Sequence, residues 1–307
     1  MAKKNRKNKD ALPEGMSRRQ AKLAARAAER AALEKDPRPF AGFTAEAELV
    51  ALQEFIASGY AKVDVTGADR DIYVCSILPG AGAVQVRDSE FGGDAFVALQ
   101  VKGRSHNPGR DLAYALNWAK DARPGETLQS TVADGTQPEL SELIDTDAEL
   151  DAQIQDDFNW WVPEKADVPV EIQHAIQQAN ETVVITRRIE ADVPGAAWFA
   201  DQGGGKTYVR WVRVDDNETA LLNALARIAA AGDLAFGEGT KFAGVFRTHG
   251  LIVPVWDLPE DAQPQDYVAE LERVDGLISA ELGNDAQLNP EERKQLENIK
   301  SRQVTIR

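Results

Sequence analysis

Apolar residues recur along much of the chain with the spacing of helices. Leu49, Leu52, Phe55 and Ile56 lie three to four positions apart within residues 44–56, which predicts an amphipathic helix. The same periodicity predicts further helices over 110–121, 170–180, 218–231 and 265–282, and another after residue 289.

Shorter runs, rich in β-branched and aromatic residues and bounded by glycine or proline, predict strands. In the first half they fall at 61–65, 72–78, 83–87 and 95–102. In the second half they fall at 182–189, 196–200 and 207–214, with two more around a turn at 247–250. Several strands follow one another without an intervening helix, which favours an α+β fold with mostly antiparallel sheets over a doubly wound fold.

The order of elements in the second half resembles that in the first. A strand, a short polar loop and an amphipathic helix occur over 95–121 and again over 207–231. This predicts two similar α+β halves and an internal duplication. The predicted divisions are a basic arm (1–37), a first α+β unit (38–123), a connector (124–165), a second α+β unit (166–260) and C-terminal helices (261–307). In the connector, Trp160 and Trp161 are expected to fill the join between the halves, with an exposed binding patch as the alternative.

The charges of the chain are divided unevenly. The whole sequence has a formal net charge of −15. Residues 1–35 hold 11 Lys and Arg against 4 Asp and Glu, whereas the remainder holds 24 against 46. A segment of net charge +7 therefore precedes a body of net charge −22. A polyanion is attracted to the first and repelled by the second.

The basic segment has two parts with different expected structures. Residues 1–12 are polar and are expected to be disordered. A capping box at 17–20 then opens an Ala-, Arg- and Glu-rich stretch that predicts a projecting helix ending before Asp36-Pro37. The residues expected to contact RNA, the ribosome surface or another polyanion are Lys3, Lys4, Arg6, Lys7, Lys9, Arg18, Arg19, Lys22, Arg26 and Arg30. We expect a non-enzymatic binding protein; the alternative for the arm is a solvated terminus without function.

A second basic cluster precedes the helix predicted at 110–121. Lys102, Arg104, His106 and Arg110 would gather at the N-terminus of that helix. Such a cluster is typical of an anion or phosphate-backbone site. The alternative is a loop whose cations balance nearby carboxylates.

The strands around the turn at 247–250 contain the densest group of chemically reactive residues. Glu238, Arg247, His249 and Asp257 would form an acid–base or binding set if they converged. This leaves open an enzyme acting on a phosphorylated small molecule, either here or at the Arg104 and His106 loop. The alternative for these residues is a structural hairpin that has glycine turns. A further alternative is a protein–protein adaptor that uses the acidic body.

Residues 200–207, ADQGGGKT, fit a relaxed form of the phosphate-binding loop of nucleotide hydrolases. That chemistry requires a helix after the lysine, because the helix N-terminus supplies amide groups to the phosphates. Here the alternating run YVRWVRV follows instead, which predicts a strand. The glycines are therefore interpreted as the tip of a hairpin, and nucleotide hydrolysis is disfavoured.

Cysteine and histidine are scarce, and this limits metal chemistry. One cysteine, Cys75 in an apolar run, and three histidines argue against a Cys/His zinc site, and a single cysteine permits no internal disulfide. No metal or cofactor is predicted. No apolar run approaches the ~18–20 residues of a membrane span, and the basic N-terminus is not followed by the apolar region of a secretory signal. We expect a cytoplasmic protein.

Four segments carry a resemblance to a known family. They are FGEGTKFAGVFRTHGLIVPVWDLP (236–259), RPFAGFTAEAELVALQEF (38–55), DDFNWWVP (156–163) and SRQVTIR (301–307). Together they resemble an uncharacterised family of actinobacterial proteins, over nearly all of the chain after residue 37. The resemblance implies no established activity or catalytic residue. Some members carry the names of a preprotein translocase motor or a topoisomerase, but this chain lacks the paired nucleotide motifs of the motor and a nicking-tyrosine context.

Overall fold

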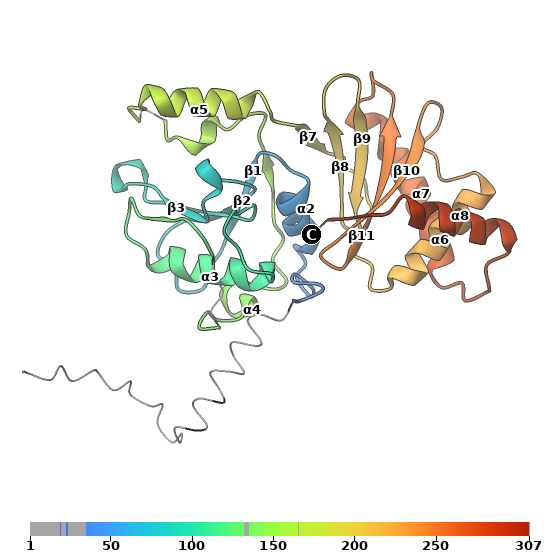
Figure 1. The fold of residues 1–307 in the computed structure, drawn as a ribbon, viewed down its shortest axis with the longest axis horizontal. Coiled ribbons are helices and arrows are strands. Elements are labelled where there is room, and N and C mark those ends of the chain that lie inside the picture. The colour runs from blue at the N-terminus through green and yellow to red at the C-terminus, as the bar shows by residue number, and fades with distance from the viewer. Residues whose placement is uncertain (1–18, 20–22, 24–34, 132–134, 165, 307) are drawn as a thin grey trace, which may run out of the picture.

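The computed structural model describes residues 35–131, 135–164 and 166–306, together with Arg19 and Leu23. Figure 1 shows two lobes, each built on a six-stranded sheet. We call them the first lobe, whose sheet spans residues 59–154, and the second lobe, whose sheet spans residues 185–305. Residues 1–34 of the predicted arm lie outside the described residues, except for Arg19 and Leu23, which are helical.

The first sheet has a mixed topology. Its strands are β1 (Gly59–Val63), β2 (Ile72–Cys75), β3 (Val84–Val86), β4 (Ala95–Ala98), β5 (Thr127–Leu128) and β6 (Gln153–Ile154), in the order β5-β3-β4-β2-β1-β6. Only the β2–β4 pair is parallel among these described strands. Helix α3 (Pro108–Asp121) packs on the sheet and buries Leu112, Leu116 and Ala119, as its spacing predicted. Short helices connect the strands: η1 (Pro79–Ala81), η2 (Ser89–Phe91) and α4 (Leu140–Leu143).

The second sheet is antiparallel except at one edge. Its strands are β7 (Ile185–Arg188), β8 (Ala196–Asp201), β9 (Thr207–Val212), β10 (Lys241–Thr248), β11 (Leu251–Leu258) and β12 (Val304–Thr305), in the order β12-β10-β11-β9-β8-β7. The edge strand β12 is parallel to β10. Helices α6 (Glu218–Ala231), α7 (Val268–Leu282, preceded by η4, Pro264–Tyr267) and α8 (Pro290–Ser301) form a helical layer, shown in Figure 1. The two faces differ: Trp211 and Trp256 lie in the core under these helices, whereas Trp198 and Val253 belong to the core of the first lobe.

The two halves are similar in architecture, as predicted, but the chain builds them by different paths. The four central strands have the same order of neighbours, β1-β2-β4-β3 and β8-β9-β11-β10. Each lobe also has a helix of 14 residues with an asparagine N-cap, Asn107 in α3 and Asn217 in α6. However, β4 is parallel to β2 whereas β11 is antiparallel to β9. The difference follows from α6, which lies between β9 and β10 and reverses the direction of the second hairpin.

Helix α2 (Glu46–Glu54) joins the two lobes, and the prediction of an amphipathic helix is wrong there. Seven of its nine residues are buried, including the polar Glu46 and Gln53. The helix contacts β8 and β9 of the second sheet on the face opposite α6, while its other sides belong to the first core. Spacing alone identified a helix, but a helix between two sheets has no solvent face.

The paired tryptophans lie in η3 (Asn159–Trp161) and do not fill the join, contrary to the expectation. The Nε1 of Trp160 donates to Ser58 Oγ at 2.8 Å, and the Nε1 of Trp161 donates to the Ile77 carbonyl at 3.0 Å. The Trp160 ring lies 5.1 Å from the Tyr60 ring. Both tryptophans therefore cover the first sheet. The same segment meets the end of the surface helix α5 (Val170–Asn180), where the Phe158 amide donates to Asn180 Oδ1 at 2.7 Å. Their indole N–H groups have partners within the first lobe, which is why they pack there.

Two further predictions from the sequence concern the single cysteine and the absence of a membrane span. Cys75 is buried and free, and burial raises the pKa of its thiol above the ordinary value. None of the helices in the described part of the chain has the length and apolar character required to cross a bilayer.

Candidate functional site

The segment that connects the basic arm to the body is held between the two lobes. We call residues 36–40 the arm root. A Cβ atom added at Gly109, on α3, would lie 2.5 Å from the Pro39 carbonyl oxygen, and one added at Gly250 would lie 2.7 Å from that of Pro37. Phe40 is fully buried. Glycine at both positions thus lets the first turn of α3 and a hairpin turn pack closely against the arm root.

Arg38 fastens the arm root through three charge-assisted hydrogen bonds. Its Nε and Nη2 donate to the two carboxylate oxygens of Glu46 at 2.7 and 2.8 Å, and its Nη1 donates to Asp216 at 2.7 Å. Glu46 is 1% exposed, so this bidentate pair is shielded from water. Hydrogen bonding to Glu46 raises the pKa of Arg38, which stays charged. The arginine therefore ties α2 to the loop before α6 and is not available to a ligand.

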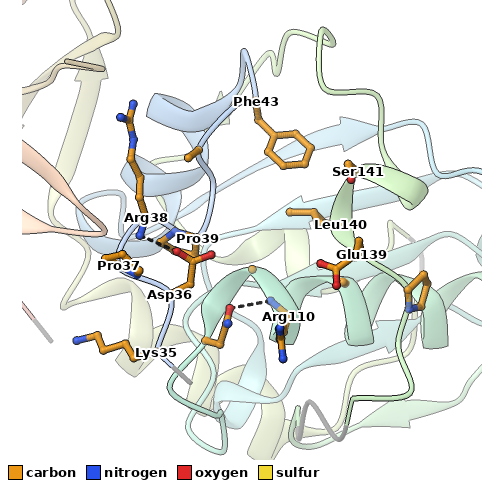
Figure 2. A pocket seen from close by; sticks show the side chains of 15 residues that line it. Lys35, Asp36, Pro37, Arg38, Pro39, Phe43, Arg110, Glu139, Leu140 and Ser141 are labelled. Carbon is orange, nitrogen blue, oxygen red and sulfur yellow. Dashed lines mark hydrogen bonds between the residues drawn. The ribbon is translucent and has the colours of Figure 1, made fainter. Parts of the chain in front are cut away.

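A hollow of about 560 Å³ opens beside the arm root. Its walls are the arm root, the first turns of α3 and residues 138–141. Figure 2 shows Arg110 between Lys35 and Asp36 on one side and Glu139 on the other, with Arg38 directed away from Arg110.

The acidic side chains of the hollow accept hydrogen bonds from the backbone, whereas two of its basic side chains form no ion pair with a described residue. Glu139 caps α4 by accepting from the backbone of residue 142, and Asp36 accepts from the Arg38 amide at 2.9 Å. Lys35 and Arg110 form no ion pair with any residue that the structure describes. Sequence reasoning found Arg110 but passed over Lys35, which stands at the end of the basic segment. An anion could therefore bind to Lys35 and Arg110 without displacing a carboxylate of the described residues from either side chain.

The predicted basic cluster before α3 is divided by the structure. Lys102 and His106 are exposed on the loop, and Arg104 lines a separate cavity of about 10 Å³. Only Arg110 reaches the hollow. An anion site shared by all four side chains therefore stays a prediction.

The N-terminus of α3 is satisfied by the protein itself. Asn107 accepts from the Arg110 amide at 3.2 Å, and the Ser105 amide and hydroxyl both donate to Asp111 at 2.9 Å. A carboxylate in the first turn already occupies the positive end of the helix dipole. Phosphate binding at the helix N-terminus, the mode that the sequence suggested, is therefore less favourable than binding in the hollow.

Glu238, Arg247, His249 and Asp257 do not converge. Arg247 pairs across the hairpin with Ile252, and Lys241 pairs with Asp257, so the two ends are separated by five residues of β11, about 17 Å. Glu238 precedes β10 at the Asp257 end.

Arg247 and His249 also point to opposite faces of the sheet. Arg247 contacts Glu218 of α6 at 2.9 Å, whereas His249 Nε2 lies 2.7 Å from Glu54 Oε1 of α2. His249 has a φ of 47°, and its ring lies 5.9 Å from that of Phe40. Its contacts are those of a residue that holds the lobes together. The geometry does not support a shared acid–base site at this hairpin.

The GGGKT segment forms the tip of the β8–β9 hairpin, as its pattern predicted. The Gln202 amide donates to the Lys206 carbonyl at 2.9 Å, and Gly203, Gly204 and Gly205 all have positive φ. Strand β9 begins at Thr207, so no helix N-terminus faces the loop. This turn lacks the amide array that a triphosphate requires.

Comparison with known proteins gives one match. A family described as a family of unknown function (DUF5926) matches residues 39–307, which leaves only the basic arm and its first junction residues outside. No curated protein matches the chain, and no solved structure matches it.

Proposed function

The chain belongs to the DUF5926 family, to which no activity is assigned, and we propose from its own charges and geometry that it binds a polyanion, RNA in the first instance. The basic arm makes most of the phosphate contacts. The hollow at the arm root, with Lys35 and Arg110, receives the phosphates next to the arm. In this proposal its role is binding rather than catalysis.

The separation of charge carries this proposal. A body of net charge −22 repels a polyanion, and the arm of net charge +7 is the part that attracts it. The arm root is clamped between the lobes, so a polyanion bound to the arm is brought to one defined place on the body. At that place two cations that form no ion pair with a described residue line a hollow.

Co-sedimentation with ribosomes and gel-shift binding to a single-stranded RNA test the arm. The informative comparison is between the full chain and a variant lacking residues 1–34, which keeps Arg38 and Phe40 in place. We expect the full chain to bind with an affinity that falls steeply with salt, because each neutralised phosphate contributes a slope of about 0.7–0.9. The shortened variant should lose most of this binding. Equal binding by both, or by neither, would remove the arm from the mechanism.

A second set of variants tests the hollow. Lys35→Gln and Arg110→Gln should each weaken RNA binding and lower the salt slope by about 1. Lys102→Gln is the matched control, since it removes one exposed charge from the neighbouring loop without touching the hollow. If Lys102→Gln has the same effect as Arg110→Gln, binding depends on diffuse charge and the hollow has no special role.

A further inference from the structure

A second concave site lies on the second sheet, on the face that α2 covers only in part. We call it the C-terminal groove, and it has a volume of about 270 Å³. The residues that matter for its chemistry are Tyr208, Arg210, Phe246, Asp257, Arg302 and Val304. The floor comes from β9, β11 and β10, and one wall comes from the segment between α8 and β12.

Gly244 brings the wall close to the floor. The register of β10 and β11 shifts between Phe242 and Gly244, and Gly244 has a φ of 142°. A Cβ atom at this position would lie 3.1 Å from the Arg302 carbonyl oxygen. The bulge and the missing side chain together let the C-terminal segment cross the sheet and enclose the groove.

Arg210 is the unusual group in this groove. Its guanidinium carbon lies 5.6 Å from the centre of the Phe55 ring and 6.0 Å from that of Tyr208. Its Nε is shielded from solvent and has no hydrogen-bond partner. Within the part of the chain that the structure describes, the side chain forms no ion pair, and burial lowers its pKa. The ring contacts offset only a fraction of the cost of removing this cation from water.

Two other arginines of the second lobe have carboxylate partners. Arg213, three residues further along, pairs with Asp215 at 2.8 Å and Asp275 at 2.5 Å. Arg188 pairs with Glu48 at 2.7 Å. Arg87 of the first lobe also has no carboxylate partner, but its Nη2 donates to the Trp160 carbonyl at 2.8 Å. Among the described residues Arg210 has neither a carboxylate nor a hydrogen-bond acceptor, which indicates a position kept for an external anion.

We propose that the C-terminal groove binds a small amino carboxylate, a free amino acid in the simplest case. Arg210 pairs with the carboxylate. Asp257 accepts from the ammonium group, since its strand position, opposite Tyr208 and two residues from the partner of Arg210, places both side chains on one face. Phe246, Val255 and Val304 contact the apolar part of the ligand.

Two cations, Arg210 and Arg302, and one anion, Asp257, line the groove. A zwitterion satisfies both Asp257 and Arg210, whereas a phosphate dianion leaves Asp257 without a partner and is repelled by it. The volume lies below the range of about 300–1,000 Å³ that is usual for drug-sized ligands, which favours a compact molecule.

Thermal-shift measurements on the full chain with each of the twenty standard amino acids provide the first test. At least one should raise the melting temperature in the millimolar range, and calorimetry then gives its Kd. The best ligand is compared with its analogues that lack one charged group; for leucine these are 4-methylpentanoate and 3-methylbutylamine. We expect weaker binding without the ammonium group and no binding without the carboxylate. The proposal fails if no amino acid binds, or if inorganic phosphate binds more tightly and competes.

Variants assign the two charges. Arg210→Met should weaken binding roughly 10- to 100-fold, as expected for the loss of a hydrogen bond between charged groups, while the ligand-free protein melts at a higher temperature. Asp257→Asn should weaken binding of the amino acid and leave that of its deaminated analogue unchanged. Arg123→Met, at a side chain 85% exposed in the first lobe, is the control for loss of one positive charge. Unchanged binding by Arg210→Met, with a lowered melting temperature, would show that Arg210 is structural and would overturn the proposal.

Discussion

One face of the second sheet has two neighbouring regions that differ in whether their basic side chains are paired with carboxylates. Where α2 covers the face, each glutamate of the helix meets a basic side chain: Glu46 pairs with Arg38, Glu48 pairs with Arg188 and Glu54 contacts His249. We call this region the joint.

Beyond the end of α2 lies the C-terminal groove, where Arg210 has no such partner among the described residues. In the joint, carboxylates of the protein itself pair with partly buried basic side chains. In the groove, our proposal assigns that role to an external ligand.

The largest effect is expected from breaking the joint at Arg38. Arg38→Met leaves Glu46 buried without a partner, which should lower the free energy of unfolding by about 3–5 kcal/mol in urea denaturation. Adding Glu46→Gln to the same chain should restore much of the loss. Lys62→Met removes the lysine of an exposed pair with Asp71 and should leave the midpoint unchanged. An equal effect of Lys62→Met and Arg38→Met would mean that the joint is no different from the surface.

A smaller effect is expected from the histidine contact of the joint. A double-mutant cycle of His249→Leu and Glu54→Gln should give a coupling free energy of about 1.5–3 kcal/mol, because both side chains are 11% exposed and lie 2.7 Å apart. Chemical denaturation of the four proteins provides the measurement. Additive effects of the two substitutions would show that the contact does not hold the lobes together.

The glycine that admits the arm root gives a third test of the joint. Gly109→Ala places a methyl group against the Pro39 carbonyl and should destabilise the protein by about 1–3 kcal/mol. It should also weaken RNA binding, since it displaces the arm root, which forms one wall of the hollow. Gly276→Ala is the matched control: its Cβ meets no atom within 4 Å in α7, so a gain of about 0.5–1 kcal/mol is expected. A neutral Gly109→Ala would mean that the arm root is free to shift.

The smallest effect has the opposite sign and belongs to the groove. Arg210→Met should raise the free energy of unfolding of the ligand-free protein by about 1 kcal/mol, since the lost desolvation cost exceeds the lost ring contacts. Arg213→Met, in the same sequence run, should instead destabilise the protein, because it leaves Asp275 and Asp215 without their cation. The two substitutions therefore separate a cation held for a ligand from one that is part of the fold. A loss of stability in both would contradict the comparison between joint and groove.

Local patterns in the sequence were sufficient for much of the fold. The helices at 170–180 and 218–231 have the bounds that their periodicity predicted, and the two predicted C-terminal helices are present. The glycine run before Thr207 forms a hairpin because alternating residues follow it. In each case the deciding interactions lie within a few residues along the chain: backbone conformation, side-chain alternation or a helix cap.

Contacts between distant segments decided the sites. The alternating run places Arg210 and Arg213 on opposite faces of the strand but does not show which of them meets a carboxylate. Arg213 is paired with two aspartates, whereas Arg210 is paired with no carboxylate of the described residues. The hollow likewise combines Lys35, Arg110 and Glu139 from three separate segments.

The sequence by itself determined the two α+β halves, the cationic arm and the acidic body, because composition and periodicity are properties of the chain. The burial of α2 on all sides, the pairing at the joint and the lone arginine of the groove were decided only in the tertiary structure. Whether a charge is paired depends on which segments pack around it, and that depends on the whole fold.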